Sequence, residues 1–289
     1  MDINDLKCEI DLYLKNYFLG KDNYNKLIYD AQSYSLNIGG KRIRPILSIL
    51  TYNAYKKDWK KALKMASAIE MIHTYSLIHD DLPCMDNDDF RRGKPTNHKM
   101  YGDNIAVLAG DALLNEAMIL LMENAKENGV SALNAALEIA KAAGSEGMIG
   151  GQAVDVTSEG KAISEDELKY MHLKKTGELI RSSIVSGALL AEAPKQDIDN
   201  LNSFGEKLGL VFQIKDDLLD VVGDEKKLGK KVHADEANDK TNFVSVYGIE
   251  KCEDLCKKLT EECIELLRSL TVNTDDLVEL TKNLLVREF

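Results

Sequence analysis

The hydrophobic and polar positions along the chain follow the period of an α-helix. In the N-terminal stretch, Ile3, Leu6, Ile10 and Leu14 recur every three or four residues, which places them on one face of a helix. Clear alternation of polar and apolar positions, typical of strands, is missing. The pattern predicts helices over residues 3–18, 22–35, 42–55, 58–80, 103–127, 131–144, 164–191, 197–220, 249–270 and 274–287.

The segments between these helices are short and rich in turn-forming residues. "NIGGK", "RRGKPTN", "GGQ" and "VGDEKKLGKK" are examples, because Gly, Pro and Asn favour turns. No stretch rich in Pro, Gly or Ser divides the chain. We therefore expect a single domain over residues 1–289, built as an all-α bundle of about ten or more helices, the longest near 37 Å.

Composition supports this picture and narrows the possible partners. The chain is 44% hydrophobic and contains only 4 Pro, which favours helices around a large core. Its net charge of −11 argues against a nucleic-acid partner. No apolar run approaches the length of a membrane span, so we expect no membrane insertion. The acidic N-terminus has no cleavage-site pattern, and we read it as neither a signal nor a transit peptide.

The five cysteines do not form a disulfide framework. Cys252, Cys256 and Cys263 share one face of a predicted helix with Leu259 and Leu266, so we interpret them as small core side chains, with a metal site as the alternative. A reducing cytoplasm follows from this cysteine usage.

Two acidic motifs each close an apolar, helix-like run. In "HDDLPCMD", Asp80 and Asp86 would lie about 120° apart on an unbroken helix. Pro83 disfavours such a helix, and a kink there could bring the two carboxylates together. In "KDDLLD", Asp216 and Asp220 share a helical face. Such crowding destabilises a helix unless a cation such as Mg²⁺ bridges the carboxylates; a solvated acidic surface is the alternative.

Clustered cations accompany both acidic motifs. "GGKRIRP" (39–45) contains Lys41, Arg42 and Arg44, and Arg91 and Arg92 follow the first acidic motif. Glycine-rich backbone and arginine side chains together favour phosphate binding, although a basic surface loop has the same composition. "KKTG" (174–177) and three further lysines flank the second motif: Lys230, Lys231 and Lys240. The alternation of acidic and basic clusters indicates two Mg²⁺–diphosphate sites.

The order of these motifs resembles a known enzyme family. "GGKRIRP", "LIHDDLPCMDNDDFRRGKPTNHK", "LAGDALL", "GGQAVD", "KTGELI" and "FQIKDDLLD" occur between about residues 39 and 243. Together they resemble short-chain trans-prenyl diphosphate synthases, the farnesyl and geranylgeranyl diphosphate synthases of bacterial and plant type. The resemblance implies the isoprenoid synthase fold around a central cavity, a cytoplasmic homodimer, and Mg²⁺ as cofactor, with three ions when substrate is bound.

The resemblance also implies roles for individual residues. Mg²⁺ ligands are Asp80, Asp86 and Asp216, with Asp81, Asp217 and Asp220 in support. Isopentenyl diphosphate is held by Lys41, Arg44, His73 and Arg92. The allylic diphosphate is held by Arg91, Lys175, Lys230 and Lys240, with Thr176 and Gln213 facing the allylic carbon. The catalytic set is then Asp80, Asp81, Asp86, Asp216, Asp217, Lys175, Thr176 and Gln213.

Some single residues have a second interpretation. His73 lies in an apolar run and could be a buried core residue. Gln152 and Asp155 could be structural or could support the second motif. Asn242 and Phe243 replace a more common Thr-Tyr pair after Lys240, which weakens the assignment of that lysine. The other histidines are interpreted as incidental: His79, His98, His172 and His233.

The implied reaction is ionisation, condensation and elimination. Mg²⁺ and the cationic side chains stabilise the departing diphosphate, isopentenyl diphosphate attacks the allylic cation, and released diphosphate can accept the proton. Three alternatives remain: a metal phosphohydrolase suggested by the His79-Asp80 pair, a terpene cyclase, and an inactive regulatory relative. A phosphohydrolase would need more histidine ligands than the spacing offers, and both acidic motifs are intact.

Product length and assembly depend on two further features. Tyr75 lies five residues before Asp80, about 7.5 Å along a helix, and Ser76 lies on the Asp80 face. In the family that the chain resembles, an aromatic residue at this place is associated with short products, so Tyr75 favours farnesyl diphosphate. Geranylgeranyl diphosphate is the alternative, if Tyr75 packs sideways. The apolar run "NIAVLAGDALLNEAMILLM" (104–122) predicts a homodimer.

Overall fold

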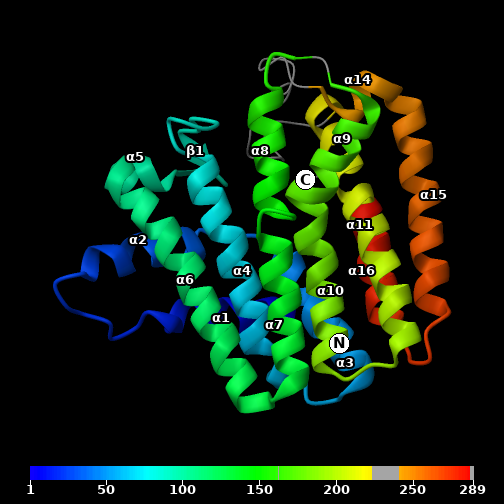
Figure 1. Ribbon diagram of the computed structural model, residues 1–289, viewed down its shortest axis with the longest axis horizontal. Helices are drawn as coiled ribbons and strands as arrows, with labels where there is room; N and C mark the ends of the chain where they lie inside the picture. The colour runs from blue at the N-terminus through cyan, green and yellow to red at the C-terminus, as the bar shows by residue number, and fades with distance from the viewer. Residues whose placement is uncertain (162, 223–240, 287–289) are drawn as a thin grey trace.

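Long helices account for most of the chain (Figure 1), in a computed structural model that describes residues 1–161, 163–222 and 241–286. The first half contains α1 (Ile3–Tyr17), α2 (Lys26–Asn37), α3 (Ile43–Tyr55), α4 (Lys60–Asp80), α5 (Asn97–Tyr101), α6 (Asp103–Asn128) and α7 (Val130–Ala143). The second half contains α8 (Met148–Ser158), α9 (Glu165–His172), the π-helical turn η1 (Leu173–Gly177), α10 (Glu178–Leu190), α11 (Lys195–Val222), α14 (Phe243–Tyr247), α15 (Ile249–Arg268) and α16 (Asp275–Val286). The expected all-α bundle is confirmed.

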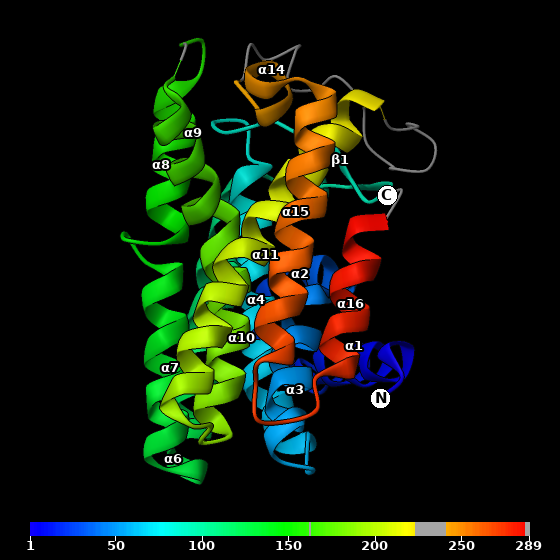
Figure 2. The ribbon, with the colours of Figure 1, turned by 90° about the vertical axis from the view of Figure 1, so that its right-hand side faces the viewer.

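The longest helices run side by side along one direction, as Figures 1 and 2 show. α10 lies in the middle and packs against α3, α7 and α11, while α4 packs against α6 and α11 packs against α15. The main core consists of the apolar stripes of these helices, for example Ile69 and Ile72 of α4 and Ile184 of α10, all fully buried. Burial of these stripes is the main favourable term that holds the bundle together.

The cysteines of α15 lie inside the protein. Cys252, Cys256 and Cys263 are at most 1% exposed, and all five thiols of the chain are free. The interpretation of the three as core side chains is therefore confirmed. Burial also raises the pKa of the Cys252 thiol to about 11, because a thiolate is poorly solvated in an apolar interior.

The "GGQ" segment is a helix, and the expected turn there is wrong. Gly150 and Gly151 lie inside α8, although glycine usually weakens a helix. A Cβ atom on Gly151 would come within 2.1 Å of the backbone nitrogen of Lys175 in η1. Glycine is thus required for close packing of α8 on η1, which the spacing of apolar residues does not reveal.

Two other short features were not predicted from the helical pattern of apolar residues. The predicted helix over 164–191 is interrupted by η1, and such π-helical turns are frequent at functional sites. A small hairpin follows the first acidic motif: β1 (Phe90–Arg91) pairs with β2 (Lys94–Pro95) in antiparallel register. Strands of two residues are too short to give an alternating pattern.

α6 is more apolar than expected from the sequence. It is the one described helix that is long and apolar enough to cross a membrane by length and composition, with a mean hydropathy of 1.8 over 18 residues, of which 39% are buried. The expectation that no run approaches that length is therefore wrong for α6, although core helices of soluble proteins pass the same test. Several apolar side chains of α6 and α7 are exposed: Val107, Leu108, Ile119, Met122, Val130, Leu133 and Leu137.

The two acidic motifs lie at the same end of the bundle. The C-terminal ends of α4 and α11 both reach the end at which β1, α9 and α14 are found (Figures 1 and 2). A helix C-terminus carries partial negative charge, so carboxylates there are unfavourable without compensating cations. The fold thus concentrates negative charge where only positive groups can stabilise it.

Candidate active site

The first acidic motif folds back on itself directly after α4. The helix ends at Asp80, and the following turn contains Pro83. The backbone N–H of Asp86 donates to the carbonyl oxygen of Asp80 at 2.9 Å. This hydrogen bond joins residues that an unbroken helix would direct apart, so the expected kink at Pro83 is confirmed and Asp86 returns to the turn that carries Asp80.

Asp80 is in an environment that disfavours its charge. Burial is the main cause that raises the pKa of its carboxyl to about 6, and the nearby charges of Asp86 and Asp81 add to the effect. Lys175 and Arg91 oppose it without cancelling it. A carboxylate in this position gains strongly from any cation that replaces the missing solvation.

Asp81 has a different environment, although it is adjacent in sequence. It is 3% exposed, and both of its oxygens accept from the Nε–H of Arg91, at 2.8 and 2.9 Å. The terminal nitrogen of Arg91 also contacts Asp81 and reaches Asp88 at 3.4 Å. The structure therefore places Asp81 as the residue that orients Arg91, at the edge of the β1–β2 hairpin.

A buried ion pair fixes the basic loop before α3. Arg42 is 3% exposed and has the left-handed backbone conformation, with φ of 53°. Its guanidinium donates to Glu70 and Asp11, both at 2.7 Å, and to the carbonyl oxygen of Leu36 at 2.6 Å. Three hydrogen bonds in a buried setting hold this loop in one conformation.

The neighbouring cations are less well neutralised. The pKa of Arg44 is lowered to about 10, mainly by burial and also by the charge of Arg92, whereas Glu70 and Asp216 oppose the change. The Nε of Arg44 is buried and has no hydrogen-bond partner among the described residues. Arg92 donates to the carbonyl oxygen of Gly39, which joins the hairpin to the basic loop. A buried, incompletely paired arginine indicates an anion site.

His73 faces this cluster of arginines. Burial lowers its pKa well below the ordinary value, and the charges of four arginines add to the effect: Arg44, Arg92, Arg91 and Arg42. A neutral imidazole can donate or accept a hydrogen bond without adding charge. His73 also lines the large cavity described below, so it is more than a core residue. Lys41, on the basic loop before α3, is exposed.

The second acidic motif contains residues with distinct environments. Asp217 is 3% exposed and accepts from the side-chain nitrogen of Gln213 and from the backbone N–H of Phe243, both at 2.8 Å. It therefore ties α11 to the start of α14. Asp220 is buried and Asp216 is half-buried. Asn242 caps α14, and the ring centroid of Phe243 lies 5.0 Å from that of His172.

η1 carries Lys175 and Thr176 into the space between α8 and α11. Lys175 donates to Asp155 of α8 at 2.6 Å, and Thr176, Gln213 and Asp217 line a smaller cavity beside it. Asp155 thus holds the ammonium group of Lys175, and its support of the second acidic motif stays a prediction. Lys230, Lys231, His233 and Lys240 lie outside the described residues.

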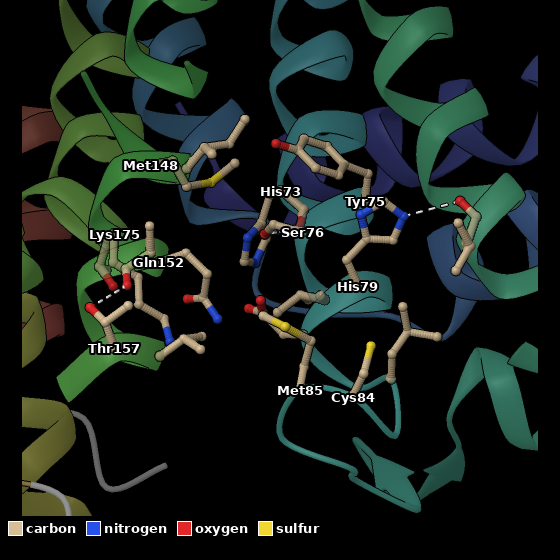
Figure 3. Close-up of a pocket in the computed structure, with 18 of the residues that line it drawn as sticks. His73, Tyr75, Ser76, His79, Cys84, Met85, Met148, Gln152, Thr157 and Lys175 are labelled. Atoms are coloured by element: carbon tan, nitrogen blue, oxygen red, sulfur yellow. Dashed lines mark hydrogen bonds between the residues drawn. The ribbon is translucent and has the colours of Figure 1, made fainter. Parts of the chain in front are cut away.

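A cavity of about 650 Å³ opens beside these groups. Figure 3 shows Tyr75, Ser76 and His79 of α4 on one side and Met148, Gln152 and Thr157 of α8 on the other. Asp80, Lys175 and Thr176 also contribute to its lining, together with apolar side chains. An apolar cavity with charged groups at one position suits an amphipathic ligand with an anionic head.

The carboxylates fit Mg²⁺ bound together with an anionic ligand. Among residues 1–161, 163–222 and 241–286, no three His, Cys, Asp or Glu side chains converge into a metal cluster. Mg²⁺ is commonly held by one or two carboxylates, with waters and phosphate oxygens as the other ligands. Asp80 and Asp86 in one turn meet that need, whereas the described part of the chain offers no histidine-rich site for a phosphohydrolase.

Glu70 and Asp11 were not identified from the sequence, although they organise the basic loop. Glu70 lies in the apolar run "ASAIEMIH" of α4 and is 2% exposed. A single carboxylate inside an apolar helical stretch indicates a buried ion pair, because charged residues are rarely buried without a partner. Asp11 gave no comparable signal, since its partner Arg42 is distant in sequence.

Comparison with known proteins identifies the family. The family model for polyprenyl synthetase matches residues 25–281. The chain belongs to the polyprenyl synthetase family. The farnesyl diphosphate synthase of Bacillus subtilis is 44% identical over 88% of this chain and 87% of its own. A chloroplastic heterodimeric geranylgeranyl pyrophosphate synthase large subunit of Arabidopsis thaliana is 44% identical over 83% of this chain and 66% of its own.

Solved structures agree with this assignment. A geranyltransferase from Helicobacter pylori, complexed with magnesium and isoprenyl diphosphate, superposes with a TM-score of 0.85 at 34% identity, covering 98% of this chain and 94% of its own. The fold is therefore the all-α isoprenoid synthase fold, as the motif order implied.

The buried pair of Arg42 and Glu70 should matter for stability. We expect Glu70→Ala to lower the free energy of unfolding by about 3–5 kcal/mol, because it leaves Arg42 buried without its main counter-charge. Urea unfolding measures this change. Asp30→Ala is the control, since it removes the exposed Lys26–Asp30 pair and should change stability by less than about 1 kcal/mol. Equal effects of the two variants would contradict the assignment.

The raised pKa of Asp80 predicts a pH-dependent stability in metal-free buffer. Its carboxyl titrates near 6 in the folded protein instead of 3.8, so its contribution is fully present below about pH 4 and lost as the pH rises through 6. We expect Asp80→Asn to raise the free energy of unfolding above pH 6, by up to about 3 kcal/mol, and to have little effect at pH 4. Urea unfolding with a chelator measures this difference. Glu253→Gln on α15 is the control. A stability difference between Asp80→Asn and the wild type that does not vary with pH would show that Asp80 has an ordinary pKa.

Proposed function

We propose that this chain is a magnesium-dependent prenyltransferase that condenses isopentenyl diphosphate with allylic diphosphates and releases farnesyl diphosphate. The observation that carries the proposal is the position of Asp80 and Asp86 beside the arginine cluster, at a cavity of about 650 Å³ lined largely by apolar side chains. This arrangement suits a diphosphate head and a hydrocarbon tail in one ligand. Membership of the polyprenyl synthetase family supports it.

Two groups of side chains would bind the two diphosphates. Lys41, Arg44, His73 and Arg92 form the isopentenyl diphosphate site, supported by the buried Nε of Arg44 that has no described partner. Arg91 and Lys175 form part of the allylic diphosphate site, together with Lys230 and Lys240. Asp80, Asp86 and Asp216 are the residues that would hold Mg²⁺, with three ions as the expected number when substrate is bound.

The chain's own residues then orient and protect the reacting groups. Asp81 fixes Arg91, and Arg42 with Glu70 fixes the loop that carries Lys41 and leads into Arg44 at the start of α3, so the cations are arranged before substrate arrives. Bound Mg²⁺ supplies charge neutralisation of the leaving diphosphate. Thr176 and Gln213 offer polar atoms near the reacting carbon, and the apolar wall of the cavity excludes water from the allylic cation.

The product length follows from the bottom of the cavity. Tyr75 lines the cavity and is 5% exposed, about 7.5 Å along α4 from Asp80. In Figure 3 its ring extends toward Met148 on the opposite wall, which supports a floor more than sideways packing. Ser76, whose hydroxyl donates to the carbonyl oxygen of His73, leaves space above that floor. Geranylgeranyl diphosphate is the second candidate, because relatives of similar identity are synthases of that product.

Assembly and location complete the proposal. The exposed apolar side chains of α6 and α7, such as Met122 at 69% and Leu133 at 57%, form a surface that a second copy would cover in a homodimer. The same covering accounts for the hydropathy of α6 without membrane insertion. The five free thiols suit a cytoplasmic location, and the family match over residues 25–281 supports a single domain.

A magnesium-dependent assay with labelled isopentenyl diphosphate and geranyl diphosphate tests the activity. We expect Asp80→Asn and Asp216→Asn to lower turnover by at least about 100-fold, because each removes a ligand that neutralises the leaving group. Thermal unfolding of the metal-free variants should show an intact fold. Wild-type protein that forms no prenyl product would refute the function, and near-normal turnover of either variant at saturating Mg²⁺ would refute that ligand.

The homodimer can be tested on the α6 surface. We expect the wild type to sediment as a dimer at micromolar concentration and Met122→Glu to shift it toward monomer, since a charge would be buried in the interface. Ile249→Glu is the control, because Ile249 is exposed but begins α15, across the bundle from α6 (Figure 1). A stable wild-type monomer would contradict the proposal.

The product of the wild type and of Tyr75→Ala tests the floor of the cavity. We expect the wild type to release a fifteen-carbon product and the variant to make longer chains, because removal of the ring deepens the cavity. Chromatography of the dephosphorylated products measures both. A twenty-carbon product from the wild type would favour the geranylgeranyl alternative.

A further inference from the structure

Tyr75 and His79 form a pair of rings on the cavity face of α4. They are four residues apart, so they lie one above the other on the same face of the helix. Their ring centroids are 5.8 Å apart and the planes meet at 79°, in an edge-to-face arrangement. Both side chains line the large cavity, as Figure 3 shows.

The orientation of Tyr75 depends on packing alone. Its hydroxyl is buried and has no hydrogen-bond partner among the residues that the structure describes. No polar contact therefore fixes the direction in which the ring crosses the cavity. The edge-to-face contact with His79 is the aromatic contact that restrains it.

His79, in contrast, is anchored to α6. Its Nε2 lies 3.0 Å from the carbonyl oxygen of Val107 (Figure 3). Because a carbonyl can only accept, the Nε2 must carry the proton and donate. The imidazole is thus held by a helix other than its own, and its ring is in place before any ligand enters.

A glycine on α6 makes room for this ring. A Cβ atom on Gly110 would come within 2.2 Å of Nε2 and 2.4 Å of Cδ2 of His79, and its three nearest atoms all belong to this imidazole. Real Cβ atoms essentially never approach that closely. An alanine at this position would therefore have to push the ring toward the cavity.

We infer that His79 is a specificity-determining residue that, seated on Gly110 and bonded to Val107, holds Tyr75 across the cavity and so sets how long a prenyl chain the cavity accepts. The inference rests on the proposed prenyltransferase function and deepens it. His79 acts through Tyr75 and is therefore a positioning residue. The bottom of the cavity, which the sequence assigned to Tyr75 and Ser76, then also depends on the ring of His79 and on α6.

The two sides of the contact predict opposite changes in product. His79→Ala removes the support of Tyr75 and opens space beside it, so at least a several-fold increase in the ratio of twenty-carbon to fifteen-carbon product is expected. Gly110→Ala pushes the imidazole into the cavity, so ten-carbon product should accumulate. In the double variant Gly110→Ala/His79→Ala the collision no longer exists, and the product should match that of His79→Ala.

Matched variants separate the ring from the other groups around it. His79→Phe keeps an aromatic ring against Tyr75 and should retain the wild-type product ratio better than His79→Ala. Asp111→Asn alters the carboxylate 3.8 Å from Nε2 without touching the ring, and should leave the ratio unchanged. Turnover of dimethylallyl diphosphate to the ten-carbon product serves as the internal control, because it does not require the deep part of the cavity.

The outcomes distinguish this inference from the function on which it rests. Wild-type protein that forms no prenyl product would refute the proposed function itself. Wild-type activity with product ratios unchanged in both His79→Ala and Gly110→Ala would overturn only the role of His79. If Gly110→Ala unfolds, as judged by thermal melting, His79→Ala and His79→Phe still decide the question. A Gly110→Ala effect that persists in the His79→Ala background would also overturn it, because the collision partner would then be another group.

Discussion

The crowding of four arginines around His73, offset by the buried carboxylate of Glu70, is the constraint on which the site depends. Besides burial, the charges of four arginines lower the pKa of His73: Arg42, Arg44, Arg91 and Arg92. These cations therefore lie close enough to repel one another. Glu70 opposes this repulsion from inside α4, with a direct bond to Arg42 and a stabilising effect on Arg44 and Arg92. Without an anionic ligand the cluster remains short of negative charge, which is the physical basis of its affinity for one.

The acidic motifs show the same imbalance with the opposite sign. Asp80 has a raised pKa because it is buried beside Asp86 and Asp81, at a helix C-terminus that adds no positive charge. The two clusters of opposite charge lie next to each other, and the pKa of Asp80 stays raised although Lys175 and Arg91 are nearby. Asp81 and Arg91 pair across the boundary between them. A ligand that brings both cations and phosphate oxygens satisfies both clusters in one step, and that is what a metal–diphosphate complex provides.

Much of the fold and part of the site could be predicted from the sequence, for identifiable reasons. Long amphipathic helices such as α1 and α11 gave strong periodic signals, and the acidic and basic motifs were visible as local clusters. α8 was missed because its glycines serve a contact with η1 that is remote in sequence. The role of Glu70 was missed because its partner is an arginine in a distant loop. Asp217 was identified from its motif as a support for the metal site. The structure adds a hydrogen bond from the backbone N–H of Phe243 to its carboxylate, which no local pattern could indicate.

The residues interpreted as incidental include one that the structure places in the cavity wall. His79 precedes the acidic motif, and in the sequence it had no visible partner. Its partners are a carbonyl oxygen and a glycine on α6, neither of which has a side chain that a pattern of polar and apolar residues could reveal. The wall of the cavity at this place is thus shared by two helices, α4 and α6. Substitutions that alter the packing of α4 on α6 can change the depth of the cavity while leaving the diphosphate site intact, because Asp80 and the arginine cluster are held by contacts with the basic loop and the hairpin.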